Sequence, residues 1–320
     1  MGLNVVADIG GTNARFALAQ AGEVSRIATL PVNAFGGVVA AMRHYLDSEN
    51  ISGRVASVCM AVAGPVRGRT ATLTNAPWAF DCDAIQRELN ADHVELLNDW
   101  EAVAWSLAGE GAESLSHWTG DAPDGSRRGA QVLIGPGTGL GVAHLFPADE
   151  GWRVVSGEGG HVTWSPRGAR QLRIAESMYE RLDHVSFERV ASGQGLVNLY
   201  EAICQLDGCV RRDLDPASIV RLGLSNEDAS CREALTVFHH ALGALAGNLA
   251  LVCSATRVCL AGGVVQQLGE DFMFQEFWRG FTEKGRLSHL LEKTPVARMT
   301  SAQPGLEGCG VWLAQSLAAV

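Results

Sequence analysis

Two glycine-rich turns, each carrying a threonine, interrupt apolar runs of this sequence at widely separated places. Residues 8–13 read Asp-Ile-Gly-Gly-Thr-Asn, and residues 135–141 read Gly-Pro-Gly-Thr-Gly-Leu-Gly. An apolar run precedes each turn and another follows it, which is typical of a β-hairpin. Because glycine has no Cβ atom, the tip of such a hairpin brings backbone N–H groups close to a ligand. The pair predicts a duplicated scaffold that holds a polyanion, and a nucleoside triphosphate is the polyanion we expect.

The better-known phosphate-binding motifs are absent from the sequence. No G-x-x-x-x-G-K-[ST] occurs, which excludes a P-loop. The turn at residues 135–141 comes near a dinucleotide fingerprint, but Leu140 stands where that motif needs its last glycine. Protein-kinase signatures such as H-R-D and D-F-G are missing as well. A single glycine-rich turn would be no more than a tight hairpin, whereas the pair indicates a phosphotransferase or an ATPase of another class.

Composition narrows the class of protein. A chain of 320 residues is long for one hydrophobic core, so we expect two domains. The apolar content of 47% and the charged content of 19% are those of a globular protein. The net charge of −10 argues against nucleic acid as a partner, because phosphate contacts need clustered lysine and arginine.

Cellular location is inferred from the cysteines and the apolar segments. The eight cysteines show no C-x-x-C spacing, and several lie inside apolar stretches, which favours reduced thiols and a cytoplasmic protein. The first residues lack the basic segment and apolar core of a secretory signal. The longest apolar segment, residues 241–255, is too short to span a bilayer and predicts a buried helix, so no membrane partner is expected.

The order of the expected elements predicts an α/β protein. Strands are expected at residues 3–7, 14–18, 23–30, 55–63 and 94–98, and helices at 36–50, 82–90 and 100–108. This order is typical of a mixed sheet flanked by helices. The polar stretch 109–129 is interpreted as a linker or long loop. Beyond it come a second hairpin at 131–146, a mostly helical region at 169–255, a strand at 257–261 and a final helix at 305–318.

Asn98 and Asp99 are the first candidates for chemistry. They end an apolar strand, at the edge where α/β proteins keep their ligand sites. A carboxylate there can take a proton from an attacking hydroxyl, as phosphoryl transfer to an alcohol requires. The alternative is that the pair only caps the following helix, because both residues are favoured at that position.

Three further places have both a functional and a structural interpretation. Glu158 and His161, in Gly-Glu-Gly-Gly-His at 157–161, suit sugar hydroxyls but also fit an ordinary surface turn. Glu188 by itself is most simply a surface ion pair with Arg189 or a neighbour. Gly262 and Gly263 end a strand, where they admit an adenine ring or form a close strand–helix joint.

Taken together, these motifs resemble the bacterial ATP-dependent glucokinases of the proteobacterial type. The resemblance rests on residues 8–13, 97–99, 135–141, 157–161, 192–200 and 261–264, which occur in the family's order. That family belongs to the hexokinase, actin and Hsp70 superfamily. The resemblance implies an α/β, duplicated ribonuclease-H-like (actin-like ATPase) fold with two domains and a cleft between them. The small α/β domain would comprise 1–109 plus 300–320, and the large α+β domain 110–299.

The resemblance also implies roles for particular residues. Asp99 would be the catalytic base, and Asp8 would act on the Mg²⁺ of MgATP, with ATP and Mg²⁺ as the cofactors. The residues expected to bind D-glucose are Asn98, Asp99, Glu158, His161 and Glu188. The residues expected to contact ATP are Ala7, Asp8, Ile9, Gly10, Gly11, Thr12, Asn13, Gly135, Gly137, Thr138, Gly139, Gly262 and Gly263. The same resemblance implies that the protein phosphorylates glucose in the first step of glycolysis and that it forms a homodimer.

Departures from the family pattern leave the reaction class intact. Gln194 stands where the family usually has proline, and Glu307 interrupts a run that is usually apolar. Two alternatives stay open at this point. One is a kinase for another hexose, such as mannose, fructose or an N-acetylhexosamine. The other is a sugar-sensing regulator that binds glucose without phosphorylating it, which the retained Asp99 disfavours.

Overall fold

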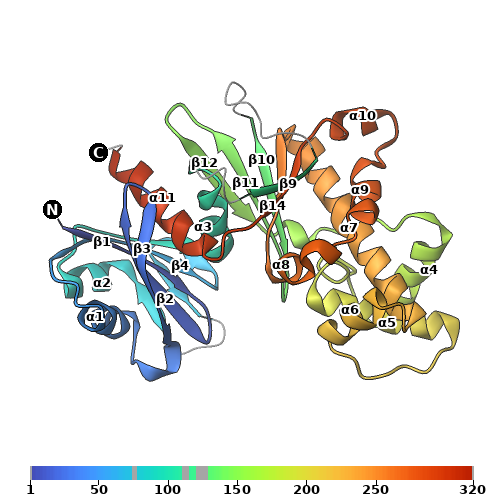
Figure 1. The fold of residues 1–320 in the computed structure, drawn as a ribbon, viewed down its shortest axis with the longest axis horizontal. Coiled ribbons are helices and arrows are strands. Elements are labelled where there is room, and N and C mark those ends of the chain that lie inside the picture. Colours follow the sequence, from blue (N-terminus) through green and yellow to red (C-terminus); the bar gives the residue numbers. More distant parts are fainter. Residues whose placement is uncertain (1, 74–77, 110–114, 120–128, 319–320) are drawn as a thin grey trace. The chain divides into compact units, whose positions relative to one another are not determined.

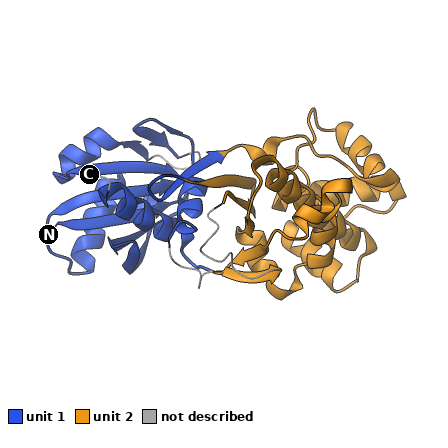
Figure 2. Ribbon diagram, turned by 90° about the horizontal axis from the view of Figure 1, so that it is seen from above, with its two compact units in different colours: residues 1–113, 148–156, 301–320 blue, residues 114–147, 157–300 orange. Residues whose placement is uncertain are grey.

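The chain divides into two compact units, coloured in Figure 2. The structure is a computed structural model that describes residues 2–73, 78–109, 115–119 and 129–318. Unit 1 comprises residues 1–113, 148–156 and 301–320, and unit 2 comprises residues 114–147 and 157–300. The division expected from the sequence differs chiefly in residues 148–156, which belong by their contacts to unit 1, and by a few residues at the boundaries near 110 and 300.

The elements of unit 1 come from both ends of the chain (Figure 1). Its strands are β1 (Leu3–Ile9), β2 (Asn13–Gln20), β3 (Glu23–Pro31), β4 (Val55–Val62), β5 (Val66–Arg67), β6 (Thr70–Thr72), β7 (Ala79–Asp81), β8 (His93–Asn98) and most of β12 (Trp152–Gly157). Its helices are α1 (Val38–Ser48), α2 (Cys82–Leu89), α3 (Asp99–Ser106) and α11 (Pro304–Ala318).

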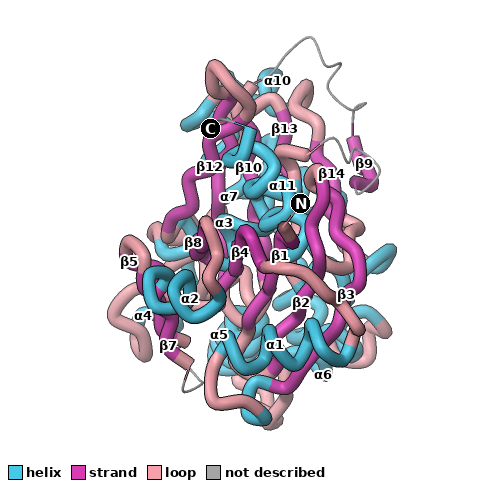
Figure 3. The backbone as a smooth tube through the Cα atoms, turned by 90° about the vertical axis from the view of Figure 1, so that its left-hand side faces the viewer, coloured by secondary structure: helices cyan, strands magenta, loops and turns pink. Residues whose placement is uncertain are grey.

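The main sheet of unit 1 has the strand order β3-β2-β1-β4-β8, seen side by side in Figure 3 for the first four strands. Strands β1, β4 and β8 are parallel, whereas β2 and β3 are antiparallel to their neighbours. Ile9 pairs with Val62, and Val62 pairs with Asn98. The first glycine-rich turn and Asp99 therefore follow strands that end at the same edge of this sheet.

Alternation along β1 decides which face each side chain occupies. Val5, Ala7 and Ile9 belong to a core with α1 and α2, and Val6 belongs to a core with α3 and α11. Successive side chains of a strand point to opposite faces, so Asp8 shares the face of Val6. The carboxylate of Asp8 therefore lies on the side of the sheet that α3 and α11 cover.

Helix α11 returns from the end of the chain to pack in unit 1, as the sequence predicted. Its Gln315 amide donates to the Trp152 carbonyl oxygen at 2.9 Å and accepts the Trp152 N–H at 3.0 Å. The unexpected Glu307 accepts a 2.7 Å hydrogen bond from the Ser301 hydroxyl. A polar residue in the first turn of α11 is thus accommodated by a local partner.

Gly308 is where α11 comes closest to α3, and Gly308→Ala is expected to destabilise unit 1 strongly. A Cβ atom there would lie 1.6 Å from the Ala102 carbonyl oxygen. That oxygen is backbone, so no side-chain rotation relieves the clash and the helices must separate. Overpacking of this kind costs about 3 kcal/mol, which denaturant unfolding would measure. Gly36→Ala, with no atom within 4 Å of the added Cβ, is the control. Equal unfolding midpoints for the two variants would contradict the prediction.

Unit 2 joins a sheet to a helical region. Its strands are β9 (Leu115–Thr119), β10 (Gln131–Pro136), β11 (Leu140–Pro147), β13 (Arg257–Leu260) and β14 (Val296–Met299). Its helices are α4 (Gly168–Tyr179), α5 (Gly193–Asp207), α6 (Pro216–Leu224), α7 (Ala229–Cys253), α8 (Gly263–Leu268), α9 (Phe274–Thr282) and α10 (Ser288–Leu291). Within unit 2 the strand order is β11-β10-β13-β14-β9.

The two sheets repeat one arrangement. In unit 2 a hairpin, β10 and β11, lies beside the parallel strands β13 and β14. In unit 1 the hairpin β1 and β2 lies beside the parallel strands β4 and β8 in the same order. Each glycine-rich turn connects the two strands of its hairpin. The duplicated scaffold predicted from the two turns is confirmed.

Helix α7 forms the centre of the larger core. It is the helix among the described residues that is long and apolar enough to cross a membrane, yet 72% of its most apolar window is buried inside the fold. His239 and His240 on this helix are buried too. The helix expected at 241–255 is observed as far as Cys253, where α7 ends, and it is buried over residues 241–247, whereas Val252 is exposed.

The linker predicted at 109–129 is wrong for residues 115–119, which form β9 and pair with β14. The segments 110–114 and 120–128 lie outside the described residues. Strand β14 was not predicted either. Both strands are short, and β9 pairs with a strand far along the chain. Local apolar periodicity therefore gives little indication of either strand.

Candidate functional site

Asp8 is the central carboxylate of unit 1. Its Oδ2 lies 3.6 Å from Nη1 of Arg15, across the β1–β2 pair. A Cβ atom added to Gly305, in the first turn of α11, would lie 2.9 Å from Cγ of Asp8. Only glycine leaves room for the carboxylate beside this helix. Neither Arg15 nor Gly305 was among the predicted site residues.

Burial raises the pKa of Asp8, the Arg15 guanidinium opposes the rise, and the charge of Asp99 adds to it. The ionised carboxylate is therefore held in surroundings that disfavour its charge. A divalent cation would relieve that cost, and carboxylate oxygens are ligands that Mg²⁺ accepts. The residues present fit an Mg²⁺ ion at Asp8.

Asn98 and Asp99 lie at the junction of β8 and α3. The Asn98 side-chain oxygen accepts the N–H of Trp100 at 3.0 Å and of Glu101 at 3.4 Å, so the predicted alternative of helix capping is confirmed for Asn98. Its Nδ2 donates to the Gly64 carbonyl oxygen at 3.4 Å. Asp99 Oδ1 accepts the Trp100 N–H at 2.9 Å. These contacts hold both side chains at the strand end, close enough for the charge of Asp99 to act on Asp8.

Unit 2 brings together three of the five residues predicted to bind the sugar: Glu158, His161 and Glu188. His161 Nε2 lies 3.8 Å from Oε2 of Glu158 and 3.7 Å from Oε1 of Glu188. The Glu158 side chain is 91% exposed and that of Glu188 is 26% exposed, so one carboxylate is open to a ligand and the other is anchored. The imidazole and two carboxylates offer both donors and acceptors, which is what hydroxyl groups need.

Glycines allow this cluster to sit against the second glycine-rich turn. Residues 159–161 form one 3₁₀ turn, and a Cβ atom on Gly160 would lie 2.2 Å from the Leu140 carbonyl oxygen. The Glu188 carboxylate accepts the Leu140 N–H at 2.9 Å. The expectation from the residues alone was a surface ion pair with Arg189 or a neighbour; the observed ion-pair partner is His161, and the carboxylate of Glu188 links it to the turn.

The glycine-rich turns themselves are closed by short backbone bonds. The Gly10 N–H donates to the Asn13 carbonyl oxygen at 3.0 Å, and the Gly137 N–H donates to the Gly139 carbonyl oxygen at 2.8 Å. Gly11, Thr12, Asn13 and Thr138 are exposed at the tips. Ala7 and Ile9, by contrast, are fully buried in β1, so their side chains belong to the cores and only their backbone is suited to a ligand.

A pocket of about 400 Å³ opens beside the turn of unit 2. It is lined by Gly137, Thr138, Gly193, Gln194, Pro216, Gly263, Val264 and Gln267. Gly262, just behind it, has φ +89°, and a Cβ there would lie 2.6 Å from the Pro136 carbonyl oxygen. Three of the residues predicted to contact ATP therefore line this pocket: Gly137, Thr138 and Gly263. Five of the lining residues were not predicted as site residues: Gly193, Gln194, Pro216, Val264 and Gln267. Of these, Pro216 and Gln267 lie outside the motifs that carry the resemblance.

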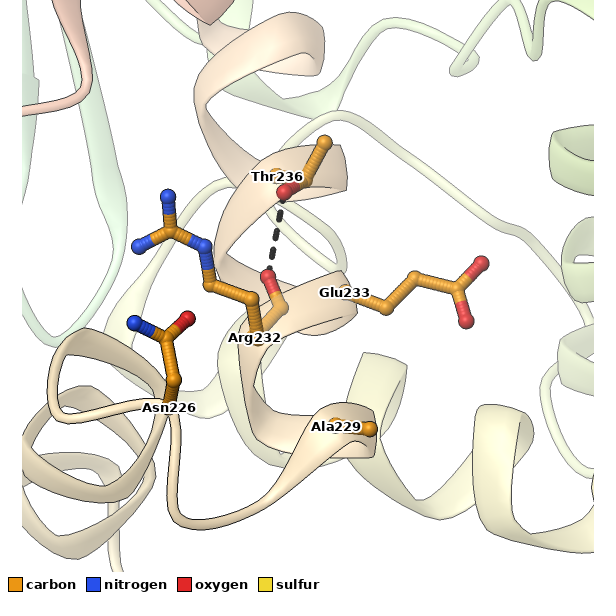
Figure 4. Close-up of a pocket in the computed structure, with 5 residues that line it drawn as sticks. All are labelled: Asn226, Ala229, Arg232, Glu233 and Thr236. Atoms are coloured by element: carbon orange, nitrogen blue, oxygen red, sulfur yellow. Dashed lines mark hydrogen bonds between the residues drawn. The ribbon is translucent and has the colours of Figure 1, made fainter.

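A second pocket of about 400 Å³ lies at the start of α7 (Figure 4). In Figure 4 Glu233 extends away from Arg232 and Asn226. Glu233 is occupied by an ion pair with Arg170 at 2.7 Å, and the Thr236 hydroxyl donates to the Arg232 carbonyl oxygen at 3.1 Å. The polar groups of this pocket serve the helix and its neighbours, and none of the predicted site residues lines it.

Comparison with known proteins gives a consistent match along the chain. A family model described as Glucokinase matches residues 5–316. The glucokinase of Chromobacterium violaceum is 42% identical over 98% of this chain and 90% of its own length. That of Klebsiella pneumoniae (strain 342) is 39% identical over 99% of this chain and 98% of its own length.

Among solved structures, the crystal structure of a glucokinase from an Antarctic psychrotroph has a TM-score of 0.89 and 30% identity, covering 98% of this chain and 99% of its own. A ROK family glucokinase from Streptomyces griseus, solved with glucose and AMPPNP, has a TM-score of 0.61 and 20% identity, covering 97% and 98%. The second likeness concerns the fold alone. Both agree with the predicted α/β, actin-like ATPase fold, which is confirmed.

Proposed function

Because the chain belongs to the glucokinase family, we propose that it transfers the γ-phosphoryl group of ATP to the 6-hydroxyl of D-glucose, giving glucose 6-phosphate and ADP. The observation that carries this proposal is the double role of Glu188. Its carboxylate contacts His161 of the hydroxyl-binding cluster and the Leu140 N–H of the glycine-rich turn. A sugar phosphotransferase needs groups that hydrogen-bond the sugar hydroxyls close to the loop that binds the phosphates. Glu188 connects the hydroxyl-binding cluster to the glycine-rich turn.

In this proposal each residue has the role that the resemblance implies for it. Asp99 of unit 1 takes the proton of the 6-hydroxyl as it attacks phosphorus. Asn98, Glu158, His161 and Glu188 bind the other hydroxyls. Backbone N–H groups of the two turns hold the phosphate oxygens, because glycine lets a phosphate approach the chain closely. Asp8 would hold an Mg²⁺ ion, which would supply charge neutralisation at the phosphates.

Hydrogen bonds between these carboxylates and the sugar hydroxyls also account for selectivity among sugars. A hydrogen bond to a charged group contributes about 1.5–3 kcal/mol. A sugar lacking one of these hydroxyls would leave Glu188 without its ligand in a largely enclosed position. Sites of this type reject such analogues by roughly 10⁴-fold. We propose D-glucose as the substrate, ahead of mannose, fructose or an N-acetylhexosamine, because relatives 38–42% identical over nearly the whole chain are glucokinases.

We also propose a cytoplasmic enzyme that forms a homodimer. All eight cysteines are free, as the sequence predicted, and six of them are buried. Free thiols are typical of a reducing compartment. Light scattering on a sizing column would measure the mass of the assembly, and a mass near the monomer's 33.9 kDa would overturn the dimer.

The test of the proposed function is the production of ADP from MgATP with glucose, mannose, fructose and N-acetylglucosamine in parallel. Turnover centred on glucose is expected. Turnover centred on another sugar would keep the reaction class and change the substrate. Absence of turnover on every sugar, with glucose still raising the melting temperature, would favour a sugar-binding regulator.

Glu158→Gln is expected to raise KM for glucose by about tenfold with a smaller change in kcat. The amide keeps the size of the carboxylate but removes the charge that strengthens its hydrogen bonds to hydroxyls. Steady-state kinetics over a glucose series would measure the change. Glu176→Gln, the same substitution at an exposed glutamate of unit 2, is the control. A KM equal to that of the unmodified enzyme would remove Glu158 from sugar binding.

A further inference from the structure

The end of α5 places an exposed cysteine beside a buried one. Cys209 is exposed to solvent, whereas Cys204 is only 2% exposed. Both are free thiols, and neither has a role in the proposed function. Cys204 lies in the last turn of the helix, which ends at Asp207, and Cys209 is the second residue beyond that end.

The cap of this helix brings the two cysteines together. Gly208 adopts the left-handed conformation, with φ 63°, which turns the chain back over the last turn of α5. The Cys209 N–H then donates to the Cys204 carbonyl oxygen at 3.1 Å. In helix caps closed by a hydrogen bond of this spacing, the side chains of the two bonded residues commonly pack together. The proximity of Cys204 and Cys209 therefore follows from the way α5 ends.

The side chains of these cysteines also interact. The Cys209 thiol donates to the Cys204 carbonyl oxygen at 3.7 Å, and its Sγ lies 3.5 Å from Oγ of Ser230 in the first turn of α7. Burial raises the pKa of the Cys204 thiol, and a hydrogen bond with the Cys209 side chain raises it further. The two thiols are therefore direct neighbours, one accessible to a dissolved oxidant and the other shielded from it.

We propose that Cys204 and Cys209 form a reversible disulfide when the protein meets hydrogen peroxide, and that this disulfide protects Cys209 from irreversible oxidation. The thiolate of Cys209 attacks one peroxide oxygen and the O–O bond breaks. The departing hydroxide takes up the proton that Cys209 released and becomes water, which leaves a sulfenic acid on Cys209.

The second step closes the disulfide. The Cys204 sulfur attacks the sulfur of the sulfenic acid, the S–O bond breaks, and hydroxide leaves as water with the proton of the Cys204 thiol. The two sulfur atoms have then lost two electrons, which the peroxide has gained. A dithiol reductant reverses the reaction. Without Cys204 the sulfenic acid would stay open to a second peroxide, which converts it irreversibly to the sulfinic acid.

The experiment treats the folded protein with hydrogen peroxide, alkylates the remaining thiols and cleaves the chain at aspartate. Asp207 stands between the two cysteines, so cleavage there yields two peptides that stay joined only by a disulfide. Mass spectrometry is expected to find joined peptides, which dithiothreitol separates. In Cys204→Ala the same treatment should raise the fraction of Cys209 found as sulfinic acid several-fold. Neither measurement needs turnover, so its outcome is independent of the proposed function.

Other cysteines of the chain supply the controls. The side chains of Cys59 and Cys309 also share a hydrogen bond, but both residues are fully buried, so this pair should stay reduced while the protein is folded. Cys253 is partly exposed and donates to the Leu249 carbonyl oxygen at 3.2 Å, and it should give no joined peptides.

The mapping of the unmodified protein decides the proposal even if Cys204→Ala is unstable. Cys209 found chiefly as sulfinic acid in the unmodified protein, or joined to a cysteine other than Cys204, would overturn it. Equal fractions of sulfinic acid at Cys209 in the unmodified protein and in a folded Cys204→Ala would overturn the protective role.

Discussion

Asp99→Asn is expected to lower kcat for glucose phosphorylation by roughly 10²–10⁴-fold, because asparagine cannot take the proton of the attacking hydroxyl. The amide oxygen of the variant can still accept the Trp100 N–H that Asp99 accepts at 2.9 Å. The start of α3 should therefore keep its structure. Glucose affinity, measured by calorimetry, should change much less than kcat.

Glu101→Gln is the matched control for Asp99→Asn. Glu101 lies two positions further along α3, and burial raises the pKa of its carboxyl group. Neutralising it should leave kcat within a few-fold of the unmodified enzyme. If Asp99→Asn kept most of its turnover and lost only glucose affinity, Asp99 would be a sugar ligand and another group would have to accept the proton.

The parts of the fold that follow from local signals could be predicted from the sequence. The two turns, their flanking strands and the final helix at 305–318 all show in the order of glycines and apolar residues, and α11 ends at the predicted residue. The alternation along β1 even decides the face on which Asp8 lies. Such signals extend over a few residues, which is why one sequence is enough to read them.

Contacts between distant residues could not be predicted in this way. Gly305 is a glycine because Asp8 lies against it, a relation that no local pattern in either segment reveals. Glu188 was interpreted from its neighbours as a surface ion pair, whereas its partner Leu140 lies 48 residues earlier in the chain. Asn98 was predicted to bind sugar or to cap a helix, and the observed cap leaves its contact with sugar a prediction. Tertiary packing decides such cases, and it is not encoded in spacing.

Asp8→Asn is expected to have two opposite effects, a large loss of activity and a gain in stability without ligands. Removing the carboxylate proposed to hold Mg²⁺ should lower kcat by about a hundredfold or more, because a metal ion at such a site stabilises the transition state by several kcal/mol. The same substitution removes a charge whose burial disfavours the folded state. The melting temperature of the ligand-free protein at neutral pH should therefore rise.

The direction of the stability change in Asp8→Asn can be checked through its dependence on pH. The pKa of Asp8 is raised in the folded protein, so the folded state binds its proton more tightly than the unfolded state does. The unfavourable contribution is absent below the ordinary value of 3.8 and complete above the raised pKa. The difference in melting temperature between Asp8→Asn and the unmodified protein should therefore grow as the pH rises from about 4 toward neutrality.

Asp92→Asn supplies a control of opposite sign. A hydrogen bond from Arg54 lowers the pKa of this exposed carboxyl group, so its removal should give no gain in stability at neutral pH.

Mg²⁺ with ADP should raise the melting temperature of the unmodified protein more than that of Asp8→Asn. A variant that lost activity but melted lower at every pH would mean that the ion pair with Arg15 outweighs the burial of Asp8. Asp8 would then stabilise the fold, and burial of its charge would carry no net cost.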